Sequence, residues 1–337
     1  MLAKVRLRAR AKRDYWIFLA RHELPIVLGV FGLVLGVATI LPNAAAIALS
    51  VIALLLGLIT FVNDYRNAKA RWSAYEFRPA GAMSDSAQPL PEPIDYRQAH
   101  YEAFPGRGTA IVDSGVDRYL QTHIVGLRVA EQPYRLPDFL ADTAPQILRT
   151  TVQGSVVFNG PVLGLSDDPL PMVTGDPIPV GVHRARFFDG QCSNELCALE
   201  IRHRDTGEVY DLRQRVLVDS AGRLASLAET DLANIVGIST IAVTTDDLVV
   251  IIVQTSNNSA SRSLLAPSGS GSLEPKDLAP GASLQQLVIV GMERELSEEC
   301  GIEPDEIAGT RVVGYARWLE RGAKPEFFGV TRLRCSS

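Results

Sequence analysis

The sequence contains few of the residues that build metal clusters or disulfide frameworks. Only four cysteines and five histidines occur in 337 residues, and none stands at the spacing of a zinc site. Cys192 and Cys197 lack a second pair nearby, so we expect reduced thiols rather than a disulfide scaffold. Aromatic residues are also sparse at 7%, but 47% hydrophobic and 21% charged residues exclude a fibrous or wholly disordered chain.

Charge is missing altogether from residues 24–63, which contain no Asp, Glu, Lys or Arg. Pro42 and Asn43 divide this stretch into runs 24–41 and 44–62, each close to the roughly 20 residues that a membrane-crossing helix needs. So short a polar turn between two helices forces an antiparallel hairpin. We therefore predict two transmembrane helices, in preference to a cleaved signal peptide or a buried helical hairpin.

Positive charge collects on both sides of the uncharged stretch. Residues 1–23 form a basic N-terminus with a net charge of +5, and residues 64–78 carry +2. The positive-inside rule then places both termini in the cytoplasm. Residues 79–337 carry a net charge of −12, which argues against binding DNA or RNA, because that binding depends on neutralising phosphates.

Composition divides the rest of the chain into three parts. Residues 63–99 extend the second helix and then become a linker rich in Pro, Ser and Ala. Residues 100–235 alternate like strands but match no fold that we can assign, with helices expected around 136–148 and over 222–234. Residues 236–337 begin with a β-hairpin over 237–255, in which Val and Ile flank a polar turn.

The most specific pattern is the run Arg294-Glu-Leu-Ser-Glu-Glu-Cys-Gly-Ile302. We expect it at the end of a helix over 283–300 that Gly301 terminates. Three glutamates then share one helix face, because they stand at i, i+3 and i+4. They are Glu295, Glu298 and Glu299. Hard carboxylate oxygens in such a group suit Mg²⁺, which can bridge a diphosphate and activate water.

These nine residues resemble the core of the Nudix motif at every defined position, and the resemblance covers about residues 235–333. It implies an α/β/α sandwich in which Arg294 orients a catalytic cluster with the three glutamates. Glu298 and Glu299 would be the main Mg²⁺ ligands, and Glu295 a further ligand or a base. The family also has a Gly-rich loop before the helix, and Gly269 and Gly271 occupy its place here.

Basic residues after the helix are candidate phosphate contacts. The candidate ligand-binding residues are Gly269, Gly271, Arg317, Lys324 and Glu326, with Arg321 as a further possible contact. For the two glycines a flexible surface loop is the alternative interpretation, and for the cations a solvated basic edge.

The sequence also departs from the family pattern. The acidic residue expected eight positions before Arg294 is the neutral Gln286, which can hydrogen-bond but cannot form an ion pair. The stretch between Gly271 and Ser283 is longer than in the family, and Ser337 comes before the usual further helix. Whether the chain is an enzyme stays open at this stage, and a ligand sensor is favoured.

Two membrane spans ahead of a Nudix-like domain resemble the transmembrane Nudix effectors of bacterial cyclic-oligonucleotide (CBASS) antiphage signalling. The expected fold class is thus α/β, with an N-terminal transmembrane hairpin and a cytosolic Nudix-like sandwich. The resemblance implies a multi-pass inner-membrane protein whose cytosolic domain senses a cyclic oligonucleotide. Its hairpins would then form a homo-oligomer among the membrane lipids, disrupt the membrane and kill the infected cell.

Two other functions are weighed against this one. The first is a membrane-tethered, Mg²⁺-dependent hydrolase of nucleoside diphosphate derivatives, for which product formation would be decisive. The second is a degenerate Nudix domain that docks a protein partner.

Overall fold

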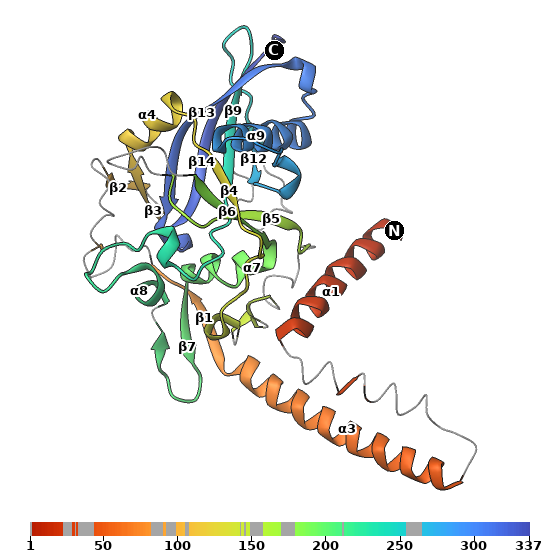
Figure 1. The fold of residues 1–337 in the computed structure, drawn as a ribbon. Helices are drawn as coiled ribbons and strands as arrows, with labels where there is room; N and C mark the ends of the chain where they lie inside the picture. The colour runs from red at the N-terminus through yellow and green to blue at the C-terminus, as the bar shows by residue number, and fades with distance from the viewer. Residues whose placement is uncertain are drawn as a thin grey trace. The chain divides into compact units, whose positions relative to one another are not determined.

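The computed structural model divides the chain into two compact units, which are described separately (Figure 1). The described residues are 2–22, 29–30, 32, 44–81, 90–91, 99–104, 108–141, 143–144, 146–148, 158–169, 179–210, 212–253 and 265–337. The first unit comprises Met1–Phe77, Asp138–Asn159 and Ile201–Tyr210. The second comprises Arg78–Pro137, Gly160–Glu200 and Asp211–Ser337.

The first unit combines long helices with most of a small sheet. Its elements are α1 (Leu2–His22), α3 (Ala44–Ser73), α5 (Asp138–Ala141) and a sheet with strand order β1-β7-β8, formed by β1 (Tyr75–Pro79), β7 (Leu199–His203) and β8 (Val209–Tyr210). Helix α1 is tied to residues 158–159, because Arg10 lies 5.3 Å from the centre of the Phe158 ring and Asp14 accepts a hydrogen bond from the amide of Asn159. Phe18 and Ala68 are buried side chains of this unit.

The predicted transmembrane hairpin is not supported. Among the residues that the structure describes, no helix is both long and apolar enough to cross a membrane. This finding overturns the hairpin as part of the fold class and, with it, the predicted multi-pass location in the inner membrane. The first predicted span, 24–41, lies outside the described residues except for 29–30 and 32. The second, 44–62, lies in α3, which continues to Ser73 as the predicted extension of this helix beyond residue 62.

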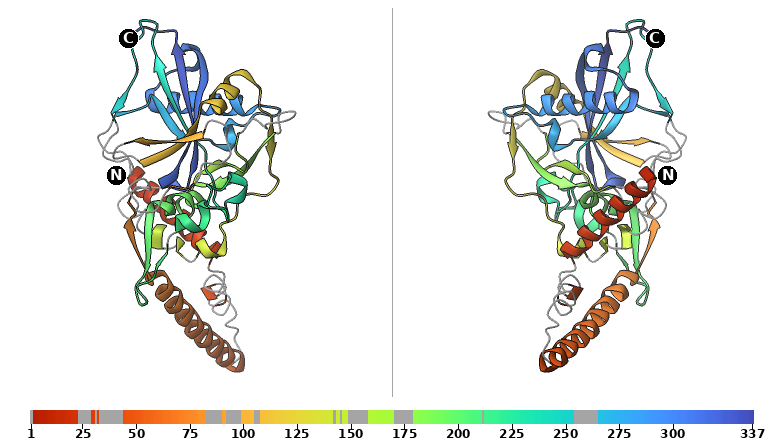
Figure 2. Two further views of the ribbon diagram at one scale, coloured as in Figure 1. Left: turned by 90° about the vertical axis from the view of Figure 1, so that its left-hand side faces the viewer. Right: turned by 90° about the vertical axis from the view of Figure 1, so that its right-hand side faces the viewer.

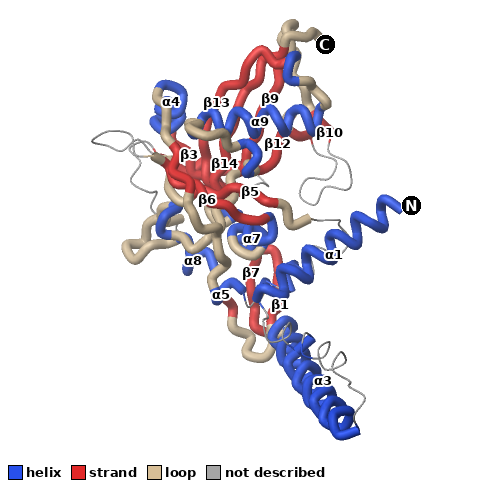
Figure 3. The backbone as a smooth tube through the Cα atoms, turned by 45° about the vertical axis from the view of Figure 1, so that its right-hand side comes forward, coloured by secondary structure: helices blue, strands red, loops and turns tan. Residues whose placement is uncertain are grey.

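The second unit is built on a six-stranded sheet with the order β12-β9-β14-β13-β3-β2 (Figures 1 and 3). The strands are β2 (Ala99–Phe104), β3 (Gly108–Asp113), β9 (Gly237–Val243), β12 (Gly269–Ser272), β13 (Ile307–Trp318) and β14 (Lys324–Leu333). Strands β9 and β14 are parallel, and the other neighbours are antiparallel. The sheet therefore takes strands from both sides of residue 235, where the sequence suggested a domain boundary.

Helix α9 (Leu284–Cys300) packs against this sheet (Figure 2). Its apolar side chains Leu287 and Met292 share one buried core with Ile238 and Phe327 from β9 and β14. Gly291 lets the helix approach closely, since a methyl group there would lie 2.8 Å from Ile238 and 2.6 Å from Leu273. Burial of this apolar surface fixes the helix, and hence the motif that it carries, on the sheet.

A smaller sheet, ordered β4-β6-β5, contributes to the same core. Its strands are β4 (Leu127–Val129), β5 (Pro161–Leu165) and β6 (Val180–Arg186), and the unit also contains α4 (Ser114–Thr122), α7 (Phe187–Gln191), α8 (Leu212–Leu217), β10 (Ile252–Val253) and β11 (Leu265–Ala266). The helix predicted over 222–234 is absent from these described residues, which contain only a short 3-10 turn at Leu227–Glu229.

Candidate functional site

The motif helix begins and ends where local chemistry dictates. Ser283 caps its N-terminus by accepting a hydrogen bond from the amide of Gln286, and the Gln286 side chain accepts one from the amide of Ser283 in return. This reciprocal capping box satisfies amides that have no partner within the helix. Gly301 closes the C-terminus with φ +69°, a left-handed conformation that glycine adopts without steric cost.

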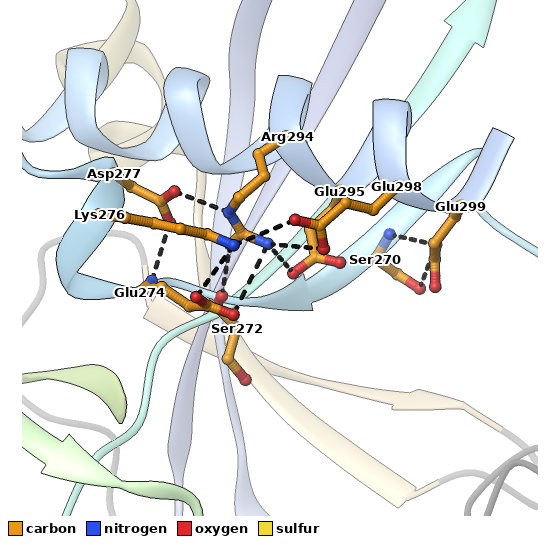
Figure 4. A network of polar contacts seen from close by, with 9 residues as sticks. All are labelled: Ser270, Ser272, Glu274, Lys276, Asp277, Arg294, Glu295, Glu298 and Glu299. Carbon is orange, nitrogen blue, oxygen red and sulfur yellow. Dashed lines mark hydrogen bonds and ion pairs between the residues drawn. The ribbon is translucent and has the colours of Figure 1, made fainter. Parts of the chain in front are cut away.

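Arg294 is the centre of a polar network beside this helix (Figure 4). Its Nε and Nη2 donate to the two carboxylate oxygens of Asp277 at 2.7 and 2.9 Å. Nη2 also donates to the carbonyl of Ser272 at 2.9 Å, and Nη1 donates to Glu295 at 2.7 Å. The Asp277 side chain is only 1% exposed, so this two-point ion pair is shielded from water.

Two further acids and one further cation complete what we call the Arg294 network. Its members are Arg294, Lys276, Glu274, Asp277, Glu295 and Glu298 (Figure 4). Lys276 Nζ lies 3.1 Å from Glu298 Oε1 and 3.2 Å from Glu274 Oε2. Arg294 Nη1 approaches the same two carboxylates at 3.5 and 3.9 Å.

Each motif glutamate has a polar partner in the structure. Arg294 Nη1 donates to Glu295 and also approaches Glu298 at 3.5 Å, Lys276 contacts Glu298, and the amide of Ser270 donates to Glu299. Within the part of the chain that the structure describes, no group of three or more His, Cys, Asp or Glu side chains is placed to hold a metal ion. Because Arg294 and Lys276 already pair with Glu295 and Glu298, the residues as arranged do not fit the Mg²⁺ that the motif implied.

Burial and charge shift several pKa values in this region. Burial raises the pKa of Glu295, while the neighbouring Arg294 opposes the shift. Burial likewise raises the pKa of Glu299, and the Ser270 amide opposes it. For Arg294, burial lowers the pKa, but the hydrogen bonds and charges of Asp277 and Glu295 outweigh it and raise the pKa overall. The arginine is thus a permanent cation of the network.

The two glycines predicted in a phosphate-binding loop lie in strand β12 instead. Gly269 pairs with Thr240 of β9, and a methyl group on it would lie 2.6 Å from the backbone nitrogen of Leu296. A methyl group on Gly271 would collide with the carboxylate of Glu295. Both glycines thus permit the close approach of a strand and a helix.

The structure brings the other three predicted ligand contacts to one end of β13 and β14. Arg317 is fully buried and donates to the carbonyls of Ala323 and Ala225, with Asp168 3.3 Å away. Its contacts are those of a residue that fixes the fold. Arg321, the further possible contact, forms an ion pair with Glu195 through its Nε and Nη2 atoms.

Lys324 differs from these two arginines. It is 6% exposed, and among the described residues its Nζ makes no hydrogen bond, the nearest acidic oxygen being Glu326 Oε2 at 4.0 Å. Glu326 accepts a hydrogen bond from Ser239 at 3.3 Å. A methyl group on Gly237 would lie 2.7 Å from Lys324 Nζ and 2.9 Å from Glu326 Cδ, so glycine is what leaves room there. We call Lys324, Glu326, Ser239 and Gly237 the Lys324 site.

Burial, with a smaller contribution from the charge of Arg321, lowers the pKa of Lys324 to about 8, while Glu326 opposes the shift. The ammonium group is therefore still mostly protonated at neutral pH, although its burial is costly. A buried cation with no close counter-ion favours an incoming anion.

Sequence reasoning missed Asp277, Lys276, Glu274 and Ser239. Gln286 drew attention because the family spacing puts an acid there, but that position lies in the first turn of α9. Eight residues of α-helix span about 12 Å, and the Gln286 side chain is instead engaged with Ser283 in the capping box. The available signal was the run Glu274-Pro-Lys-Asp277, a proline-started turn rich in charge just before the helix.

Comparison with known proteins adds no identification. No family model matches the chain, and no curated protein is significantly similar to it. The relation to Nudix proteins therefore rests on the motif residues and stays a prediction.

Proposed function

We propose that the second unit is a Nudix-type sensor that binds a nucleotide and does not hydrolyse it. The observation that carries the proposal is the Lys324 site, where a buried ammonium group has no acidic oxygen closer than 4.0 Å. A phosphate group is the anion that such a cation suits, because it offers several acceptor oxygens and a full negative charge. Arg317 and Arg321 already have carboxylate partners, which leaves Lys324 as the principal phosphate contact among the three.

The arrangement of the motif glutamates supports sensing over hydrolysis. A metal-dependent hydrolase needs carboxylates that are free to converge on one ion, whereas Glu295 and Glu298 are already paired with the cations Arg294 and Lys276, and Glu299 with the amide of Ser270. The resemblance to CBASS effectors no longer includes the two membrane spans, but its Nudix-like part makes a cyclic di- or trinucleotide the first ligand to test. We also expect ligand binding to promote association of several copies, because a ligand that prefers an assembled state shifts the population toward it.

The test is calorimetric titration of the purified full chain with cyclic dinucleotides and cyclic trinucleotides, with chromatography of the mixture to detect products. We expect binding without turnover, and an affinity at least tenfold lower for Lys324→Met. Arg332→Met is the matched control, since Arg332 is an exposed cation on the same strand. Its affinity should equal that of the wild type.

Other outcomes separate the alternatives. Mg²⁺-dependent cleavage of nucleoside diphosphate derivatives that Glu298→Gln abolishes would establish the hydrolase instead. Absence of binding and of cleavage for every nucleotide tested would refute both functions. Sedimentation velocity with and without ligand measures the expected self-association.

A further inference from the structure

Lys276 bridges two carboxylates beside the motif helix, one of which is an expected metal ligand (Figure 4). Its Nζ is 3.1 Å from Glu298 Oε1 and 3.2 Å from Glu274 Oε2. Glu298 is a motif glutamate, and Glu274 belongs to the stretch before the helix that is longer than the family pattern. One ammonium group thus joins an expected metal ligand to an acid that the pattern does not contain.

The local fold delivers Lys276 to this position. Residues Pro275–Asp277 form a 3-10 turn, in which the amide of Glu274 donates to Asp277 Oδ2 at 2.8 Å. Asp277 is in turn anchored by its two-point pair with Arg294. Because Lys276 directly precedes this buried anchor, the backbone from which its side chain extends is fixed close to Glu298.

We propose that Lys276 is a tethered cation that replaces a divalent metal ion at Glu274 and Glu298. It supplies positive charge to the carboxylates without offering the open coordination positions through which a metal would activate water. This role of Lys276 rests on the proposed function. It explains how a Nudix-type site could bind a ligand without cleaving it. The Lys276 side chain is 53% exposed, so the contact is one that a substitution can remove without opening the core.

The inference predicts that removing the tethered charge creates affinity for a divalent cation. The probe is Mn²⁺, followed by electron paramagnetic resonance and by calorimetry on the full chain without nucleotide. Lys276→Met should bind Mn²⁺ at least tenfold more tightly than the wild type. Lys276→Arg keeps the charge and should behave like the wild type, and the double variant Lys276→Met with Glu298→Gln should lose the gain.

Three results would overturn the inference: equal Mn²⁺ affinity in the wild type and Lys276→Met, no binding by either protein, or a gain in Lys276→Arg as large as that in Lys276→Met. Circular dichroism of each variant confirms that it is folded. Because the probe is the metal alone, a failure here leaves nucleotide binding at the Lys324 site untouched. Conversely, a gain of Mn²⁺ binding in a chain that binds no nucleotide would uphold the tethered cation and refute the proposed function.

Discussion

The Arg294 network and the Lys324 site differ in how closely carboxylates pair with their positive charge. Arg294 has carboxylate oxygens at 2.7 and 2.9 Å and a carbonyl at 2.9 Å. Lys324, whose side chain is 8% exposed against 12% for Arg294, faces one carboxylate oxygen at 4.0 Å. A buried cation whose hydrogen bonds are complete stabilises one specific geometry. A buried cation without a close partner destabilises the fold through its lost hydration, and an anionic ligand can offset that cost. The family-like motif thus has the features of a structural clamp, and the less conspicuous lysine those of a binding site.

The largest expected effect comes from breaking the clamp. Asp277→Asn leaves Arg294 buried without the charge that balances it, so the free energy of unfolding should fall by about 3 kcal/mol, as for other buried pairs that lose one partner. Urea denaturation followed by circular dichroism measures the change. Asp247→Asn is the control, because its pair with Arg332 is exposed on both sides and should cost less than about 1 kcal/mol. Equal losses of unfolding free energy in Asp277→Asn and Asp247→Asn would show that the buried pair is no stronger than the exposed one.

Substitution of Lys324 is expected to raise the free energy of unfolding, whereas substitution of Asp277 lowers it. In the unfolded chain Lys324 has its ordinary pKa of 10.5, against about 8 in the folded state. The unfolded state therefore binds more protons between these values, and wild-type stability should rise as the pH increases from about 8 to 10.5. Lys324→Met avoids the cost of the buried charge and should gain up to about 3 kcal/mol at pH 7.

Thermal unfolding from pH 6.5 to 9.5 tests this second prediction. The advantage of Lys324→Met should be largest at the low end of that range and shrink above about pH 8, where the wild-type lysine loses its proton in the folded state. A variant that is less stable than the wild type at pH 7, or whose advantage does not depend on pH, would show that the lysine is not electrostatically costly.

The smallest effects concern Gln286. Gln286→Ala removes half of the capping box and should cost about 1 kcal/mol. Gln286→Glu restores the family residue but should change stability by less than about 0.5 kcal/mol, since glutamate also caps and Arg294 already pairs with Asp277. Denaturation of the double variant with Asp277→Asn is the sharper measurement. Rescue of that variant by the new glutamate would mean that position 286 reaches Arg294 after all.

The sequence predicted best where local signals and tertiary packing agree. The helix over 283–300 has a capping box, a terminal glycine and an apolar face, and the structure has α9 at Leu284–Cys300. The predicted helix over 222–234 failed because side chains compete for its backbone. Asp219 accepts hydrogen bonds from the amides of Ala221 and Arg223, and Ser226 pairs with Glu229 in a short turn.

For the candidate site too, the sequence predicted the residues with local signals and missed those that only tertiary structure brings together. The motif spacing placed three glutamates on one helix face, but Lys276, the partner of Glu298, comes from a stretch whose length differs from the family pattern. Lys324 and Glu326 were found by their nearness in sequence to the motif. Ser239 and Gly237 could not be, because only the parallel pairing of β9 with β14 brings them beside Glu326. The transmembrane prediction relied on two uncharged runs of suitable length, a polar turn between them and basic flanks, and the finding for the described helices overturned it.

The position of β14 has a consequence for synthesis of the chain. This strand follows all others of its sheet in sequence, yet it lies between β9 and β13. A nascent chain on the ribosome cannot join the two halves of the sheet until residues 324–333 have emerged from the exit tunnel. Until then the edges of β9 and β13 are open to other strands, which is when a chaperone would be needed most.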